Sequence, residues 1–119
     1  MFQRIHILFV CTANISRSPV AAGLFANSAY YEAKSAGTSP AKNPAIKTVP
    51  VTQELIDWAD QIFVMEEIHL KFLRDNFKVD GKHVQVMNVP DKFNAALAKD
   101  FEELNLIFKD KLREYLINR

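Results

Sequence analysis

Ile7-Leu8-Phe9-Val10-Cys11-Thr12-Ala13-Asn14-Ile15-Ser16-Arg17-Ser18-Pro19 is the most informative stretch of this 119-residue sequence, because an apolar run ends at the only cysteine and an arginine follows six positions later. The short, partly β-branched run up to Val10 is typical of a strand that is buried on both faces. Ser18-Pro19 predicts the start of a helix, with serine as the N-cap and proline at the first helical position. The stretch therefore indicates a strand, a loop and a helix, in that order.

The predicted loop has the properties of an anion site. Cys11 lies at the carboxyl end of the strand, which is where open α/β sheets bind ligands. Backbone N–H groups of the loop and the positive end of the following helix can surround a phosphate there, and Arg17 can bind two of its oxygens at once. The same field stabilises a thiolate, so we expect Cys11 to be nucleophilic at neutral pH. The expected phosphate-binding residues are Thr12, Ala13, Asn14, Ile15, Ser16 and Arg17.

The remaining sequence alternates between strand and helix patterns. We expect strands at residues 1–10, 30–36, 61–65 and 83–89 and helices at 19–29, 52–58, 67–77 and 96–117, with a loop at 37–50. This alternation predicts one α/β domain spanning residues 1–119, in which a four-stranded parallel sheet is flanked by helices on both faces. The apolar side of the last helix is expected to comprise Leu97, Phe101, Leu104, Phe108, Leu112 and Leu116.

Composition narrows the possible functions. The net charge is +1 and no block of Lys and Arg occurs, so we expect no nucleic-acid partner. No apolar run approaches the ~18 residues of a membrane-spanning helix, and we expect no membrane partner. A single cysteine cannot form an internal disulfide, which favours a cytoplasmic location.

The loop resembles that of the low-molecular-weight protein tyrosine phosphatases, in which Cys, five residues, Arg and then Ser or Thr follow one another. Three later segments also look like parts of that family and occur in its order: residues 35–38, 58–65 and 89–91. The length is similar to that of a shortened bacterial branch. The resemblance implies a flavodoxin-like fold and a cysteine-dependent hydrolase that needs no cofactor and no metal. Its substrate would be a phosphotyrosine-containing protein or a small aryl phosphate, and phosphate or sulfate would bind in the loop.

The resemblance also implies catalytic roles. Cys11 would attack phosphorus and form a phosphocysteine, while Arg17 binds the phosphoryl oxygens. Asp91 would act first as general acid and then as general base. Phe93 would line the cleft beside the substrate ring, and Glu66 lies near an acidic position of the family that contacts the loop arginine.

Further residues would support the loop. Ser18 can offer its hydroxyl to the sulfur of Cys11. Asn14 tolerates a left-handed backbone, and in the family the matching residue bonds to the serine that corresponds to Ser35. Ala13 replaces the usual glycine, so the site requires a negative φ there. The segment at 37–51 has no aromatic residue, which implies a shallower cleft than in longer members.

Other residues have structural interpretations. His6, His69 and His83 lack the spacing of metal ligands, and we expect them on strands or on helix surfaces. Trp58 and Met65 are expected in the core.

Three functions remain open. The first is hydrolysis of phosphomonoesters, most simply of phosphotyrosine. The second is arsenate reduction on the same scaffold, in which an external thiol would have to supply the later steps because Cys11 is the only cysteine. The third is a phosphocarrier or a phosphate-binding module without hydrolysis, although carriers of similar fold lack the arginine.

Overall fold

A computed structural model describes residues 3–40 and 45–117 of the chain. Its centre is a four-stranded parallel sheet in the order β2-β1-β3-β4. In register, Phe9 of the central strand lies opposite Ser35 on one side and Phe63 on the other. The strands are β1 (Ile5–Cys11), β2 (Tyr31–Gly37), β3 (Gln61–Val64) and β4 (His83–Val86). The predicted sheet is confirmed.

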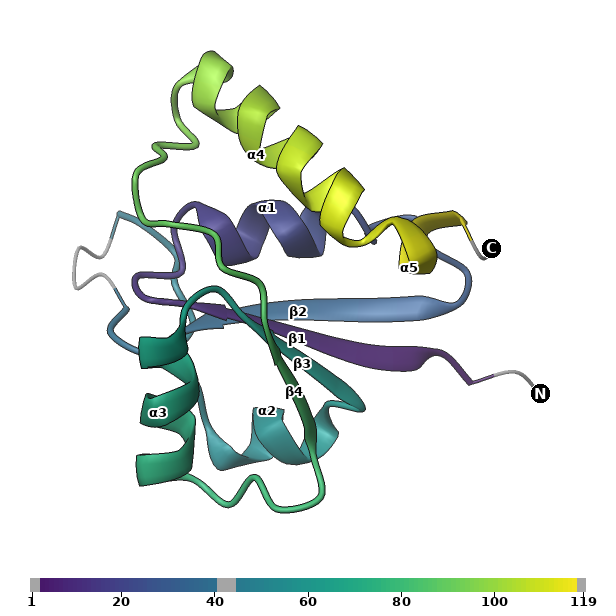
Figure 1. Ribbon diagram of the computed structural model, residues 1–119, viewed down its shortest axis with the longest axis vertical. Coiled ribbons are helices and arrows are strands. Elements are labelled where there is room, and N and C mark those ends of the chain that lie inside the picture. Colours follow the sequence, from purple (N-terminus) through teal and green to yellow (C-terminus); the bar gives the residue numbers. More distant parts are fainter. Residues whose placement is uncertain (1–2, 41–44, 118–119) are drawn as a thin grey trace.

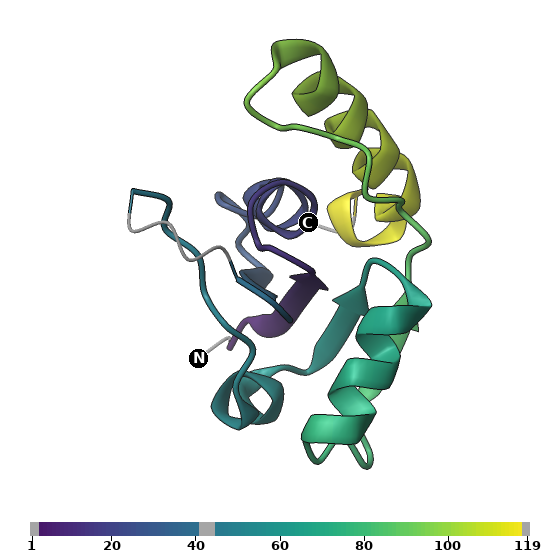
Figure 2. The same cartoon turned by 90° about the vertical axis from the view of Figure 1, so that its left-hand side faces the viewer.

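Helices cover both faces of this sheet (Figures 1 and 2). One face carries α1 (Arg17–Gly23), α4 (Ala98–Lys111) and α5 (Arg113–Ile117), and the other carries α2 (Gln53–Trp58) and α3 (Glu67–Asn76). Successive residues of β1 point to opposite faces, so that the strand contributes to two separate cores. Ile7, Phe9 and Cys11 pack on the side of α1 and α4, whereas Leu8 and Val10 pack on the side of α2 and α3. The three layers have the flavodoxin-like arrangement that the sequence predicts.

The parallel strands bring two distant loops to one edge of the sheet. β1 ends at Cys11, and residues 12–16 connect it to α1, at the left in Figure 1. Residues 87–97 follow β4 and lead to α4. Because all strands run in the same direction, the segment that contains Asp91 and the loop after Cys11 leave the sheet at the same edge.

The first helix differs from its predicted range of 19–29. It begins at Arg17 with Ser16 as the N-cap, and it ends at Gly23, where Leu24 N–H bonds to Ala21 O at 3.2 Å in a tighter turn. Ser18 is therefore not the N-cap. Its hydroxyl contacts side chains of the loop, which makes it unavailable to the helix.

The last predicted helix is two helices. The chain breaks at Leu112, with φ −105° and ψ 17°, between α4 and α5. Leu104, Phe108 and Leu112 are buried as expected, but Leu97 and Phe101 are 56% and 45% exposed. In Figures 1 and 2 the first turns of α4 extend beyond α1, and no other helix or strand of the described residues lies beside them.

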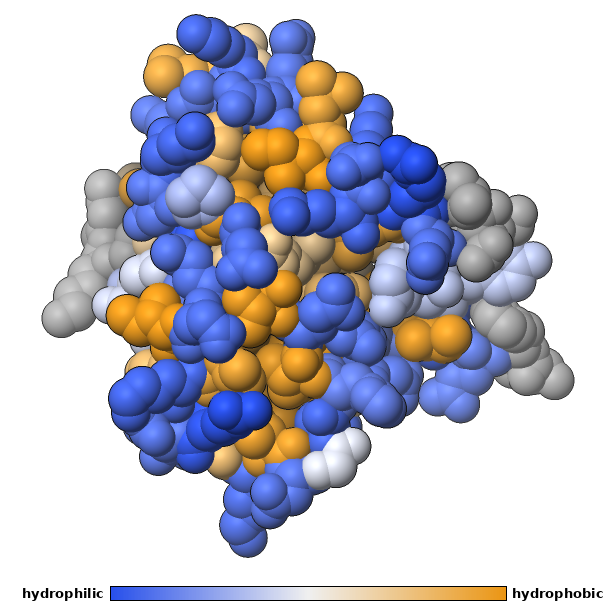
Figure 3. Space-filling view, viewed as in Figure 1, coloured by the Kyte–Doolittle hydropathy of each residue, from blue (hydrophilic) through white to orange (hydrophobic). Residues whose placement is uncertain are grey.

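Outside the cores, apolar side chains also reach the surface. On the face shown in Figure 3 they form scattered groups among hydrophilic residues. Met65 is fully buried as predicted, whereas Trp58 is half-buried and stacks on the His6 ring with 4.2 Å between centroids. Within residues 3–40 and 45–117, no helix is long and apolar enough to cross a membrane.

Candidate active site

The sulfur of Cys11 has a hydroxyl beside it. Ser18 Oγ lies 3.0 Å from Cys11 Sγ and accepts a hydrogen bond from Asn14 Nδ2 at 2.9 Å. The hydroxyl hydrogen can therefore be donated to the sulfur, with the carbonyl of Ala36, at 3.3 Å, as the longer alternative. A donor at this distance stabilises negative charge on the sulfur.

Asn14 links the loop to two other segments. Its φ is 60°, and its buried side chain donates from Nδ2 to Ser18 Oγ and to Ser35 Oγ at 3.0 Å. Its Oδ1 accepts the backbone N–H of Val49 at 2.8 Å. The left-handed backbone and the Ser35 contact are confirmed, while the bond to Val49 was not foreseen because that residue lies in an aperiodic segment. Ala13 has a negative φ, as its replacement of glycine requires.

The loop backbone carries unused donors. Among the described residues, no hydrogen bond uses the N–H groups of residues 12–17, although neighbouring carbonyls bond normally. Thr12 O accepts Ser39 N–H at 2.8 Å, and Ser16 O accepts Val20 N–H at 3.1 Å. Unsatisfied N–H groups beside a partly enclosed pocket are the donors that an oxyanion needs.

Arg17 is held from one side. Its side chain is 3% exposed, and Nη1 donates to Glu66 Oε2 at 2.6 Å and to Val89 O at 2.8 Å. Nη2 lies 3.4 Å from Thr12 Oγ1 and 3.8 Å from Asp91 Oδ2. One nitrogen is thus anchored to protein oxygens, whereas the other lies next to the loop and Asp91. The proximity of Glu66 to the loop arginine, suggested by the resemblance, is confirmed.

These groups border a pocket of 270 Å³. Ile15 and Phe93 give it apolar walls, and Asp91 comes from the segment after β4. Ser16 Oγ accepts Ala95 N–H at 3.1 Å and so ties the two loops together. The lining residues are Cys11, Thr12, Ala13, Ile15, Ser16, Arg17, Asp91, Phe93 and Asn94. Asn94 is a lining residue that sequence reasoning missed, and Phe93 is half-buried, packing partly against the core.

His69 is the main correction at the site. It was expected on a surface, but it is buried in the first turn of α3, and its Nε2 lies 2.8 Å from Thr12 Oγ1. Burial, and then the charge of Arg17, lower its pKa below 6.5, against the opposing effect of Glu66 and Asp91. A lone histidine in an amphipathic helix carries no sequence signal for this position.

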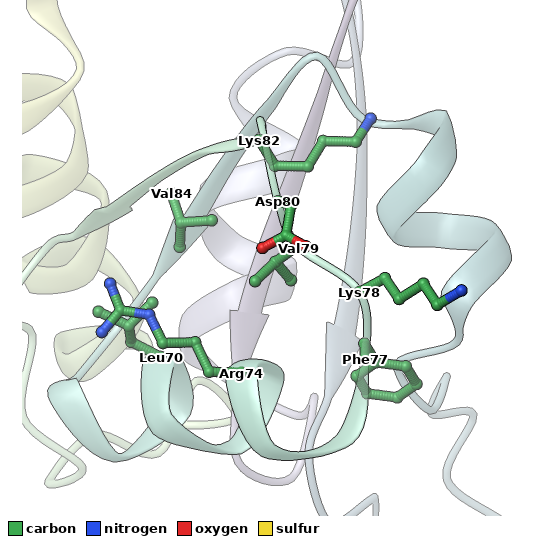
Figure 4. Close-up of a pocket in the computed structure, with 8 residues that line it drawn as sticks. All are labelled: Leu70, Arg74, Phe77, Lys78, Val79, Asp80, Lys82 and Val84. Atoms are coloured by element: carbon green, nitrogen blue, oxygen red, sulfur yellow. The ribbon is translucent and has the colours of Figure 1, made fainter.

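A second pocket, of 480 Å³, lies between α3 and β4. Figure 4 shows that the head groups of Lys78 and Lys82 point away from Arg74, so the three cations do not converge on one point. Lys82 Nζ also donates to the carbonyls of Asp57 and Ala59, at 3.0 and 2.9 Å, near the end of α2. The described residues that line this pocket include no cysteine, serine or threonine, whereas the pocket at Cys11 has a thiol beside an arginine.

The family model described as low molecular weight phosphotyrosine protein phosphatase matches residues 6–54, which include the loop but not Glu66 or Asp91. No curated protein matches the chain. Solved structures of similar fold include a low molecular weight protein tyrosine phosphatase from T. tengcongensis, with 26% identity, a TM-score of 0.67 and coverage of 94% of this chain and 99% of that one. The YwlE arginine phosphatase from Geobacillus stearothermophilus gives 27% identity, a TM-score of 0.61 and coverage of 94% and 92%.

A third structure is the tyrosine phosphatase Wzb from Escherichia coli K30 in complex with phosphate. It gives 20% identity and a TM-score of 0.69, and covers 94% of this chain and 99% of that one. The resemblance to the low-molecular-weight phosphatases is thereby confirmed. The match to the family model and the similar solved structures together support a cysteine-dependent phosphatase, and those structures include both tyrosine and arginine phosphatases.

Proposed function

We propose that this chain, which shares the loop and the fold of the low-molecular-weight phosphatases, hydrolyses phosphotyrosine or a related aryl phosphate through a phosphocysteine on Cys11. One observation carries the proposal. Cys11 lines a pocket together with loop residues whose backbone N–H groups have no described partner, and the buried Arg17 also lines it. This combination binds an oxyanion and places a nucleophile beside it.

The first step transfers the phosphoryl group to the protein. The Cys11 thiolate attacks phosphorus, an S–P bond forms and the P–O bond to the leaving group breaks. The N–H groups of residues 12–17 and Arg17 bind the three equatorial oxygens, whose charge is greatest in the transition state. Asp91, in its protonated form, gives a proton to the leaving oxygen. Its carboxylate is 70% exposed and lies 3.8 Å from Arg17, so it can move to the substrate without breaking a buried contact.

The second step releases phosphate. Asp91, now ionised, takes a proton from a water molecule that attacks phosphorus, and the S–P bond breaks. The hydroxyl of Ser18 stabilises the departing thiolate of Cys11 at 3.0 Å. Protons balance over the two steps, because Asp91 gives one and regains one.

The pocket walls favour an aryl group. Ile15 and Phe93 offer apolar surface to a phenyl ring, and Asp91 is the only acidic residue among the described lining residues. Phosphoarginine is the second candidate, because a neighbour with 27% identity is an arginine phosphatase. A guanidinium leaving group would gain from further carboxylates near the pocket mouth, and the described lining offers none.

The function is tested with p-nitrophenyl phosphate and a phosphotyrosine peptide. Wild type should hydrolyse both, and Cys11→Ser should lose the activity. Asp91→Asn should slow hydrolysis more for a phenol of high pKa than for p-nitrophenol, since a poor leaving group depends more on the acid. Asp75→Asn, which removes an exposed carboxylate on α3, is the matched control.

Other outcomes separate the alternatives. Full activity in Cys11→Ser would exclude the proposal. Turnover of arsenate with an added thiol, without ester hydrolysis, would favour a reductase. A stable phosphocysteine that never releases phosphate would favour a carrier. Faster turnover of a phosphoarginine peptide than of the phosphotyrosine peptide would reassign the substrate.

A further inference from the structure

The hydrogen-bonding state of His69 follows from its two partners. Nδ1 lies 3.0 Å from the backbone nitrogen of Glu66, which can only donate. Nδ1 is therefore an acceptor and carries no hydrogen. In the neutral ring the hydrogen is then on Nε2, which lies 2.8 Å from Thr12 Oγ1 and donates to it. Burial and the nearby cation of Arg17, which lower the pKa of His69, favour this neutral form.

Thr12 thus receives two donors. His69 Nε2 donates at 2.8 Å and Arg17 Nη2 donates at 3.4 Å, so both lone pairs of the Thr12 hydroxyl are used. The hydroxyl hydrogen must point elsewhere, and among the described residues no acceptor takes it. Thr12 lines the 270 Å³ pocket together with Cys11.

We propose that the Thr12 hydroxyl donates a hydrogen bond to a phosphoryl oxygen in the pocket, and that His69 is the positioning residue that directs this hydrogen there. The proposal deepens the proposed function and rests on it only in that the pocket binds a phosphoryl group. It adds a side-chain donor to the backbone N–H groups and to Arg17.

The position of His69 explains why this donor is fixed. The ring spans from the first turn of α3 to the first loop residue, and its Nδ1 bond orders the backbone at Glu66, whose carboxylate holds Arg17. The charges that act on the pKa of the ring are those of Arg17, which lowers it, and of Glu66 and Asp91, which raise it. Protonation of the ring would end its role as acceptor from Glu66 N–H and would place a second cation beside Arg17.

Binding of inorganic phosphate, measured by calorimetry at pH 7.5, tests the donor directly. Thr12→Val, which keeps the shape and removes the hydroxyl, should weaken phosphate binding on the order of 10- to 100-fold, the range for a hydrogen bond to a charged group. Thr12→Ser should restore most of that loss. Thr12→Val with wild-type affinity would overturn the proposal.

A double-mutant cycle tests the positioning role. His69→Leu should weaken phosphate binding by a clearly larger factor in the wild-type background than in Thr12→Val, because the part of its effect that passes through the hydroxyl is already lost in Thr12→Val. An equal loss in both backgrounds would show that His69 acts through the fold or through Glu66 and Arg17 and not through the Thr12 hydroxyl, and it would overturn the assigned role. His69→Gln, whose amide nitrogen can still donate to Thr12, should bind nearly as wild type. This variant keeps the test decisive if His69→Leu does not fold.

Two controls complete the design. His83→Gln changes an exposed histidine on β4 and should leave phosphate binding unchanged. Hydrolysis is not needed for the readout. A wild type that binds phosphate in a Thr12-dependent way but does not hydrolyse esters would refute the proposed function and leave this inference standing.

Discussion

Glu66 and Asp91 both face Arg17, but they should contribute very differently to stability. Glu66 Oε2 lies 2.6 Å from Arg17 Nη1 and its side chain is 38% exposed. Asp91 Oδ2 lies 3.8 Å from Nη2 and its side chain is 70% exposed. The guanidinium between them is buried, so loss of the closer carboxylate leaves a partly uncompensated cation inside the protein.

The magnitude for Glu66→Gln lies between two limits. Breaking a fully buried pair costs about 3–5 kcal/mol, and an exposed pair contributes about 0–1 kcal/mol. Glu66 is partly open, the glutamine oxygen can still accept, and Val89 O keeps its bond to Nη1. We therefore expect Glu66→Gln to lower the free energy of unfolding by about 1–2 kcal/mol, and Asp91→Asn by less than about 0.5 kcal/mol.

Urea denaturation at low and high salt measures both effects. Salt should reduce the small contribution of Asp91 and leave that of Glu66 nearly unchanged, because exposed charges are screened far more than partly buried ones. If Glu66→Gln were as stable as wild type, or if Asp91→Asn were the more damaging change, Arg17 would not be anchored as described.

Three further predictions concern the residues around the loop. Burial and Arg17 lower the pKa of His69 in the folded state, so near and below about pH 6.5 the unfolded chain binds more protons than the folded protein. The free energy of unfolding should therefore fall as the pH decreases from 7.5 to 5.5. Urea titrations should show a shallower fall in His69→Gln, and an unchanged slope would contradict the assignment. Gly37→Ala should lower the free energy of unfolding by about 1–3 kcal/mol, because its Cβ would lie 2.5 Å from a backbone oxygen of the loop. Gly23→Ala is the control: its Cβ would have open space around it, so thermal unfolding should show unchanged or higher stability. Asn14→Ala loses three hydrogen bonds and keeps a left-handed backbone, so it should lower the free energy of unfolding by about 3 kcal/mol. Ser35→Ala loses one of these hydrogen bonds and should lower it by about 1 kcal/mol in the same urea titration. Equal losses in the two variants would be inconsistent with this network.

Local spacing was enough to predict much of the candidate site. The apolar run before Cys11 forms the central strand, and Arg17 and Asn14 follow it at fixed offsets within one loop. Residues so close in sequence have few ways to arrange themselves around a strand end. The left-handed conformation predicted for Asn14 is therefore confirmed, as is the placement of this loop at the carboxyl edge of the parallel sheet.

Helix ends and exposed faces were predicted less well. Ser18-Pro19 has the composition of an N-cap, yet Ser18 contacts Cys11 and Asn14, because a buried sulfur and amide compete for its hydroxyl. Leu97 and Phe101 continue the apolar periodicity of α4 but are exposed, and the first turns of this helix extend beyond α1 in Figure 1. The apolar periodicity of a helix shows which of its sides is more stable when buried, but burial also requires another element that packs against that side.

The sequence by itself determined the order of strands and helices, the loop after β1 and the placement of Cys11 and Arg17 at its two ends. Only the tertiary structure decided that His69 lies against Thr12, 57 positions away, whereas the contact of Glu66 with Arg17 was already suggested by the family resemblance. The physical reason is that the few rotatable backbone bonds between neighbouring residues limit the conformations of a short loop, so its sequence largely decides which of its side chains lie together. The contact of α3 with that loop depends instead on how β3 pairs with β1 and on which side of the helix then packs inward.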